Sequence, residues 1–170
     1  KARREGVGEI RELIKTEAWS GSASVGVDAP LIIKNETSVR AAERELNADF
    51  RRFHAGCHAA NLGRPFAQNV SAFSRRLQEA GFLHGACIAP QQPGRYQIEV
   101  HPHAATIGLF GLNRIVKYKR GNRAARASEL NRLRSLLLEH LPKLDPALHL
   151  DLPEVPQTGS PKAVEDQIDA

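Results

Sequence analysis

Apolar residues recur at helical spacing in several parts of this chain, and polar residues fill the positions between them. Near the N-terminus, Ile10, Leu13 and Ile14 stand at i, i+3 and i+4, which places them on one face of a helix. Serine or proline precedes some of these segments and glycine follows another, as is typical of helix boundaries. The pattern predicts helices over residues 8–15, 39–53, 71–80, 103–110, 124–141 and 162–170.

Two short runs alternate apolar and polar residues, and each is ended by a proline, which predicts strands. The first run begins at Ala23 and ends at or just after Asp28, and the second extends from Arg95 to His101. Strands that alternate with helices predict a layered α/β fold. Because two strands are too few for an independent sheet, we expect further strands upstream of Lys1.

The composition suits a single globular domain over residues 1–170. Hydrophobic residues make up 41% and charged residues 25% of the chain, values that exclude a disordered chain and a coiled coil. No run approaches the roughly 20 apolar residues that a membrane span needs, and Cys57 and Cys87 are too few for a disulfide framework. We therefore expect a cytoplasmic protein without a membrane partner. Since the chain starts at Lys1 and contains no methionine, we interpret it as a fragment. We expect it to be truncated at both ends, because a last helix that begins at Lys162 is cut short at Ala170.

Charge is distributed unevenly along the chain. The formal net charge is +5, yet residues 114–134 hold eight basic residues against Glu129, whereas residues 145–170 hold six acids against Lys162. A basic segment favours a polyanionic partner, so residues 114–134 predict contact with nucleic acid. The simpler interpretation is that these residues keep a loop soluble. The candidate phosphate-binding residues are Lys117, Lys119, Arg120 and Arg123.

Carboxylates occur in two places that suit a metal site. Asp28 follows the first strand, and open α/β sheets bind ligands at the carboxyl ends of their strands. Asp166 and Asp169 are three residues apart in the last helix, where they can share a face. Together these carboxylates suit Mg²⁺ or Mn²⁺, which prefer hard oxygen ligands. The simpler interpretations are a turn hydrogen bond for Asp28 and a favourable helix-dipole interaction for Glu165.

Glu99 and His101 alternate to one side at the end of the second strand, and His103 follows just beyond. A carboxylate and an imidazole in this place suit metal binding or acid–base chemistry. A lone histidine after a strand more often has a structural role, so this feature alone leaves both interpretations open.

A zinc site is a rival interpretation of two other histidines. His54-x-x-Cys57 and His84-x-x-Cys87 repeat one spacing and together could offer two nitrogen and two sulfur ligands. The chain lacks the usual Cys-x-x-Cys knuckle, which favours two unrelated thiols. It also lacks the glycine-rich nucleotide loops and the Gly-x-Ser-x-Gly elbow of hydrolases.

Several stretches keep the order and spacing of one protein family: VGVDAPL at 25–31, RRFHAG at 51–56, EVHPH at 99–103, KYK at 117–119 and EDQIDA at 165–170. Through them the chain resembles the domain-of-unknown-function family 429. That family is regarded as predicted nucleases of the ribonuclease H-like superfamily, which implies a mixed sheet flanked by helices and a divalent-metal carboxylate site. The resemblance also implies an opening strand with a Gly-x-Asp pattern and two antiparallel strands before Lys1. It assigns site roles to Asp28, Glu99, His101, Asp166 and Asp169.

These observations predict a divalent-metal-dependent nuclease. The three aspartates would hold Mg²⁺ or Mn²⁺, and basic residues near Lys117 would position the nucleic-acid backbone. The alternative is a nucleic-acid-binding or partner-binding domain that has the same fold and no catalytic activity. An actin-like phosphotransferase would require glycine-rich phosphate hairpins, which the chain lacks.

Overall fold

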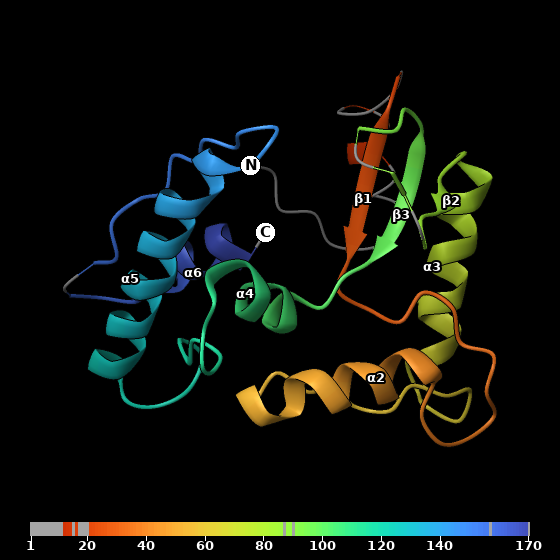
Figure 1. Ribbon diagram of the computed structural model, residues 1–170, viewed down its shortest axis with the longest axis horizontal. Helices are drawn as coiled ribbons and strands as arrows, with labels where there is room; N and C mark the ends of the chain where they lie inside the picture. The colour runs from red at the N-terminus through yellow and green to blue at the C-terminus, as the bar shows by residue number, and fades with distance from the viewer. Residues whose placement is uncertain are drawn as a thin grey trace. The chain divides into compact units, whose positions relative to one another are not determined.

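The computed structural model describes residues 12–14, 16, 21–86, 88–89, 91–156 and 158–169, and of Asp169 only the backbone (Figure 1). The predicted helix over residues 8–15 lies outside this part of the chain except for 12–14, which are helical. The chain divides into two compact units, residues 1–51 with 56–105 and residues 52–55 with 106–170. The expectation of one domain stays a prediction.

A small parallel sheet organises the first unit. Its strands are β1 (Ala23–Val27), β2 (Leu83–His84) and β3 (Arg95–Glu99), in the spatial order β1-β3-β2. Both pairings are parallel, and Val27 is paired with Glu99, so β1 and β3 end at the same level. The predicted α/β class is confirmed. The described strands include none of the antiparallel pairs that a mixed sheet requires.

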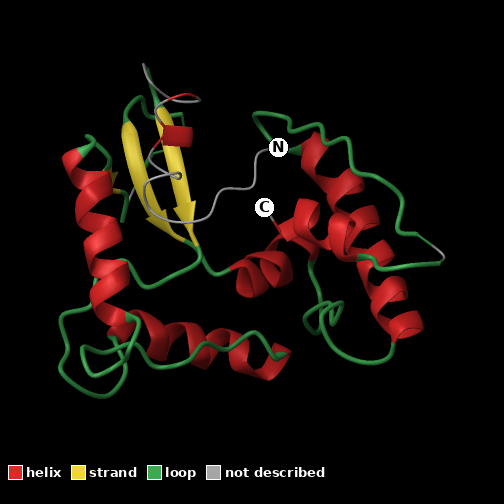
Figure 2. Cartoon of the chain, turned by 180° about the vertical axis from the view of Figure 1, so that it is seen from behind, coloured by secondary structure: helices red, strands yellow, loops and turns green. Residues whose placement is uncertain are grey.

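Helix α3 (Ala67–Glu79) packs against this sheet (Figure 2). Leu77 of α3 and Phe82, just after the helix, are almost completely buried, and so is Gln97 of β3. The side-chain amide of Gln97 donates to the backbone oxygens of Ser74 at 3.1 Å and Phe82 at 3.0 Å. Because a buried amide must find hydrogen-bond partners, these contacts fix α3 against β3.

Helix α2 (Ala41–Phe50) and the 3-10 turn η1 (Arg51–Phe53) replace the single helix predicted over residues 39–53. The helix begins late because Ser38 has a positive φ of 65° and Arg40 is extended. Arg40 occupies the N-cap position, two residues after Ser38, the serine that precedes the predicted helix. The side chain of Glu43, three residues later, accepts from the backbone N–H of Arg40 at 3.0 Å, which is one of the two bonds of a capping box.

The second unit is helical. It contains α5 (Arg123–His140), η2 (Leu141–Lys143) and α6 (Lys162–Asp169), and most of α4 (Pro102–Phe110). Leu130 and Leu133 form the buried side of α5. The guanidinium of Arg134 donates to the backbone oxygens of Leu152 at 2.8 Å and Pro153 at 2.9 Å, which holds the following proline-rich tract against the helix.

The predicted boundaries of α5 and α6 agree with the structure to within one residue. Helix α3 begins four residues before the predicted start, and the two-residue strand β2 was not predicted. A two-residue strand has no room for an alternating pattern. None of the described helices is both long and apolar enough to cross a membrane.

Candidate functional site

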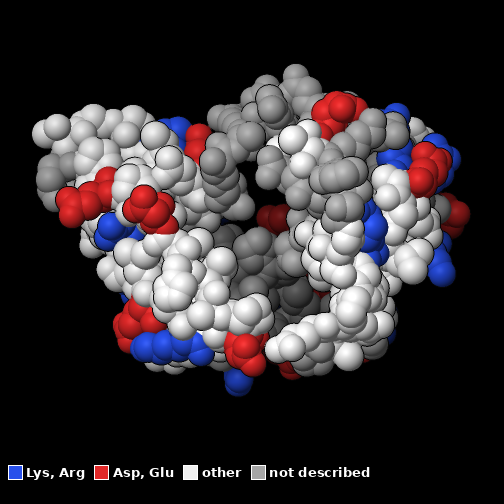
Figure 3. All heavy atoms as spheres, turned by 90° about the horizontal axis from the view of Figure 1, so that it is seen from above, with Lys and Arg blue, Asp and Glu red and all other residues white. Residues whose placement is uncertain are grey.

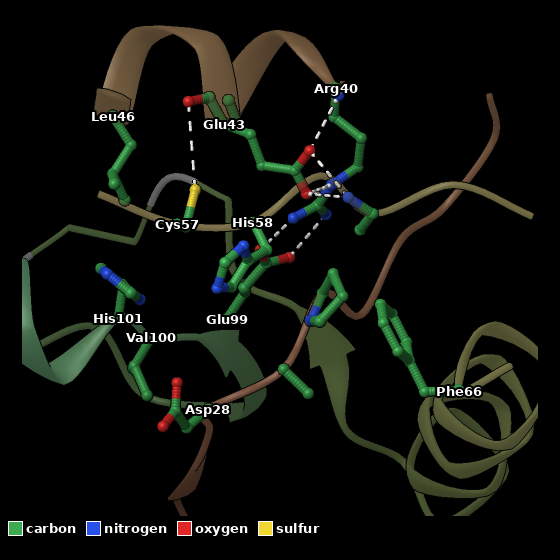
Figure 4. A pocket seen from close by; sticks show the side chains of 14 residues that line it. Asp28, Arg40, Glu43, Leu46, Cys57, His58, Phe66, Glu99, Val100 and His101 are labelled. Carbon is green, nitrogen blue, oxygen red and sulfur yellow. Dashed lines mark hydrogen bonds and ion pairs between the residues drawn. The ribbon is translucent and has the colours of Figure 1, made fainter. Parts of the chain in front are cut away.

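A pocket of about 230 Å³ lies at the carboxyl ends of β1 and β3, within the first unit (Figure 4). Parallel α/β sheets commonly bind ligands at this edge. The lining is mixed, with a polar part and an apolar part. The polar part comprises Asp28, Arg40, Glu43, Cys57, His58, Glu99 and His101, and the apolar part comprises Ala29, Pro30, Ala42, Leu46, Ala60, Phe66 and Val100.

The pocket brings together three of the residues predicted from the sequence, Asp28, Glu99 and His101. They converge because β1 and β3 are parallel neighbours, and the backbone N–H of Val100 donates to the oxygen of Val27 at 3.0 Å. Asp28 is exposed and His101 is half-buried. In Figure 4, Asp28 lies on the opposite side of the pocket from Arg40.

Glu99 is held by hydrogen bonds. Its Oε2 accepts from Nη1 of Arg40 at 2.9 Å and from the backbone N–H of Leu31 at 3.1 Å, and its Oε1 accepts from Nη2 of Arg40. Charge-assisted bonds of this bidentate kind are strong and fix geometry. The structure therefore shows Glu99 as a carboxylate held by Arg40 and Leu31, although its side chain is 38% exposed.

Arg40 and Glu43 belong to the same network, and sequence reasoning did not identify them. Nε of Arg40 donates to Oε1 of Glu43 at 2.8 Å, and the backbone N–H of Ala60 donates to both Glu43 oxygens. Burial alone would raise the pKa of Glu43, but the hydrogen bonds from Ala60 and Arg40 outweigh it and lower the pKa. The hydrogen bond with Glu99 outweighs burial and raises the pKa of Arg40. In the sequence these two residues look like ordinary polar positions at a helix start.

The zinc interpretation gains no support from the described residues. Cys57 is half-buried, and burial raises the pKa of its thiol. His84 Nε2 lies 3.1 Å from the hydroxyl of Ser74, and Cys87 lies outside the described residues. Within the described part of the chain, no group of three or more His, Cys, Asp or Glu residues could hold a metal ion.

The predicted acids of the last helix belong to the second unit. Asp166 lies 2.8 Å from the ammonium of Lys162, and nothing is described of the Asp169 side chain. Glu165 is 6% exposed and forms ion pairs with Arg126 at 3.1 Å and Lys162 at 3.0 Å. The interpretation of Glu165 as a helix-dipole acid was therefore incomplete, because it is a buried partner of α5.

The basic segment also lies in the second unit. Its ion pairs join Arg126 to Glu165, and Arg114 and Arg132 to Glu129. The side-chain nitrogen of Lys119 lies 5.3 Å from the centre of the Tyr118 ring. The four candidate phosphate-binding residues, Lys117, Lys119, Arg120 and Arg123, are all exposed.

The parallel sheet, the helices and the charged pocket at the carboxyl edge define an α/β protein with one candidate ligand site in its first unit. The family model described as "Protein of unknown function (DUF429)" matches residues 1–170, and the chain belongs to this family. The resemblance seen in the sequence is confirmed to that extent. No curated protein and no solved structure matches the chain significantly.

Proposed function

We propose that the chain is a divalent-metal-dependent nuclease that works at the carboxyl-edge pocket, within a ribonuclease H-like fold. One observation carries the proposal: Asp28 and His101 follow two paired parallel strands and line the same pocket. An exposed carboxylate and an imidazole are the groups that phosphodiester hydrolysis needs for cation binding and proton transfer. The ribonuclease H-like placement rests on the family resemblance.

The charge of the pocket supports a cation. Its lining holds three acids and one base, so its formal charge is −2 when the histidines are neutral. A phosphodiester would be repelled from such a pocket unless a cation entered with it. Mg²⁺ often binds through one or two carboxylates and retains several waters, so it does not require a cage of three protein ligands.

The residues present thus fit a loosely held Mg²⁺ or Mn²⁺ rather than a preformed site. Asp28 would hold it, since the oxygens of Glu99 already accept hydrogen bonds from Arg40 and Leu31. When bound, the ion would stabilise the negative charge of the phosphate. His101 would move the proton, because an imidazole can act as both acid and base near neutral pH. Asp166 and Asp169 stay proposed ligands on the basis of the resemblance.

A non-catalytic nucleic-acid-binding or partner-binding domain is the second candidate. It is favoured by the absence, among the described residues, of a group of three metal-binding side chains. In this case the exposed basic residues around Lys117 and Arg120 would bind nucleic acid without cleaving it.

A cleavage assay distinguishes the two. Purified protein is incubated with Mg²⁺ or Mn²⁺ and with single-stranded and duplex DNA and RNA, together with the variants Asp28→Asn and His101→Gln. We expect divalent-dependent cleavage that each substitution lowers by about 100-fold or more. Asp169→Asn tests Asp169, one of the two ligands proposed from the resemblance, in the same way.

The control is Asp49→Asn, which should cleave like wild type. Asp49 is an exposed acid of α2 that lies outside the pocket. Binding without cleavage by wild type would favour the second candidate.

A further inference from the structure

We propose that Arg40 is a positioning residue that sets the geometry of Asp28 and His101, an inference that rests on the proposed function. Arg40 precedes α2, and its side chain is only 14% exposed. Its guanidinium contacts Glu99, the last residue of β3, and Ile32, in the segment that follows β1. One side chain thus links the two places from which Asp28 and His101 arise.

The first link is to β3. Both terminal nitrogens of Arg40 donate to the carboxylate of Glu99, the last residue of that strand. His101 follows Glu99 by two residues, and the intervening Val100 is bonded to Val27 of β1. The backbone that carries His101 is therefore fixed on one side by β1 and on the other by Arg40.

The second link is to the segment after β1. Nη1 of Arg40 donates to the backbone oxygen of Ile32 at 3.0 Å, and Glu99 accepts from the backbone N–H of Leu31 at 3.1 Å. Just before Asp28 in the chain, the backbone oxygen of Val27 accepts from Val100. Shortly after it, Leu31 and Ile32 form the two bonds just described. The short loop that carries Asp28 is thus held at both ends.

The third link anchors Arg40 itself. Glu43, which is 4% exposed, accepts from Nε at 2.8 Å and from the backbone N–H of Arg40 at 3.0 Å. The backbone N–H of Ala60 donates to the same carboxylate. The planar fork of arginine can bond both glutamates in this way, whereas the single ammonium of lysine cannot reproduce the geometry.

This arrangement gives Glu99 a role that differs from acid–base catalysis. With Arg40 bonded to both of its oxygens, Glu99 orients the loop of Asp28 through Leu31. Figure 4 shows the bonds between Arg40 and Glu99 on the side of the pocket away from Asp28.

The test is a kinetic comparison of Arg40→Lys and Glu99→Gln with wild type, on the nucleic acid that wild type cleaves best. Because a shift of about 1 Å in a catalytic group can cost about 100-fold in rate, we expect kcat to fall by about 10- to 100-fold while KM changes by less than about 3-fold. The control is Arg75→Lys. Arg75 is an exposed residue of α3, and its Nε lies 3.9 Å from Oε1 of Glu79. Unchanged kcat in folded Arg40→Lys would overturn the inference.

A second measurement separates this inference from the proposed function. Resonances of the His101 ring and of the Asp28 and Leu31 amides are recorded by NMR in all variants. We expect them to move in Arg40→Lys and Glu99→Gln and to stay in place in Arg75→Lys. If wild type cleaves nothing, the nuclease proposal fails, and moved resonances still support Arg40 as the residue that sets this geometry. Unmoved resonances in both pocket variants would overturn the inference whatever the activity.

Discussion

Glu165 shows how a contact distant in sequence changes the meaning of one residue. Its place in the first turn of α6 predicts a solvent-exposed acid that interacts with the helix dipole. In the structure Arg126, which lies 39 residues earlier, donates to Glu165 Oε2 at 3.1 Å. The acid therefore links α6 to α5, and no local pattern around Glu165 could reveal this partner.

Glu165→Gln should destabilise the second unit by about 1.5 to 3 kcal/mol, the usual worth of hydrogen bonds to a charged group. The substitution keeps the size of the side chain but removes the charge that Arg126 and Lys162 bind. Chemical denaturation monitored by circular dichroism measures the change. The matched control is Glu139→Gln, since the side chain of Glu139 is 63% exposed and its Oε1 lies 3.2 Å from Nζ of Lys143. Exposed pairs contribute little, so this control should stay within about 0.5 kcal/mol of wild type. Equal effects in the two variants would contradict the prediction.

At the scale of elements, the start of α2 depends on an ionised glutamate. Glu43 accepts hydrogen bonds from Arg40 and from the backbone of Ala60, and these contacts lower its pKa below the ordinary value of 4.5. A lowered carboxyl pKa stabilises the fold at pH values above the ordinary one, and this contribution is lost as the pH falls through the folded-state value.

The free energy of unfolding of Glu43→Gln, measured from pH 7 to pH 3, tests this dependence. We expect the variant to be less stable than wild type by about 1 to 3 kcal/mol at pH 7. The difference should persist above pH 4.5, the ordinary pKa of glutamate, and should shrink below it, because the unfolded wild-type chain takes up a proton before the folded one does. Glu45→Gln is the control, because Glu45 is an exposed residue of the same helix. A difference that stays constant down to pH 3 would show that the charge of Glu43 is not what matters.

Elements with strong local patterns were predicted well, and those that depend on distant partners were not. The alternating runs predicted β1 and β3, and the leucine spacing predicted α5 to within one residue at each end. In the candidate site, the parallel pairing of β1 and β3 brings Asp28, Glu99 and His101 to one pocket. These three were predicted as candidates because each lies at or just after the end of an alternating run. Arg40 and Glu43 were not, since their importance arises from Glu99 and Ala60, which are far away in sequence.

At the scale of the whole molecule, net charge alone does not identify a binding surface. Several basic residues of the 114–134 segment form ion pairs with Glu129 or Glu165. On the face shown in Figure 3, Lys and Arg side chains lie beside Asp and Glu in several places. The basic character of the chain therefore has to be assigned residue by residue, and the exposed turn around Lys117 and Lys119 is the first place to test.

The dependence of nucleic-acid affinity on salt tests that turn. Each phosphate contact releases condensed counterions, so log K falls with log salt by about 0.7 to 0.9 per contact. If both lysines contact phosphates, Lys117→Ala combined with Lys119→Ala should reduce the slope by about 1.4 to 1.8. The charge-matched control is Lys34→Ala combined with Arg75→Ala, two exposed residues outside the segment. Fluorescence anisotropy with a labelled oligonucleotide at several salt concentrations gives the slopes. An equal reduction in both double variants would indicate a general effect of net charge, and an unchanged slope in the Lys117 and Lys119 variant would assign these lysines to solubility.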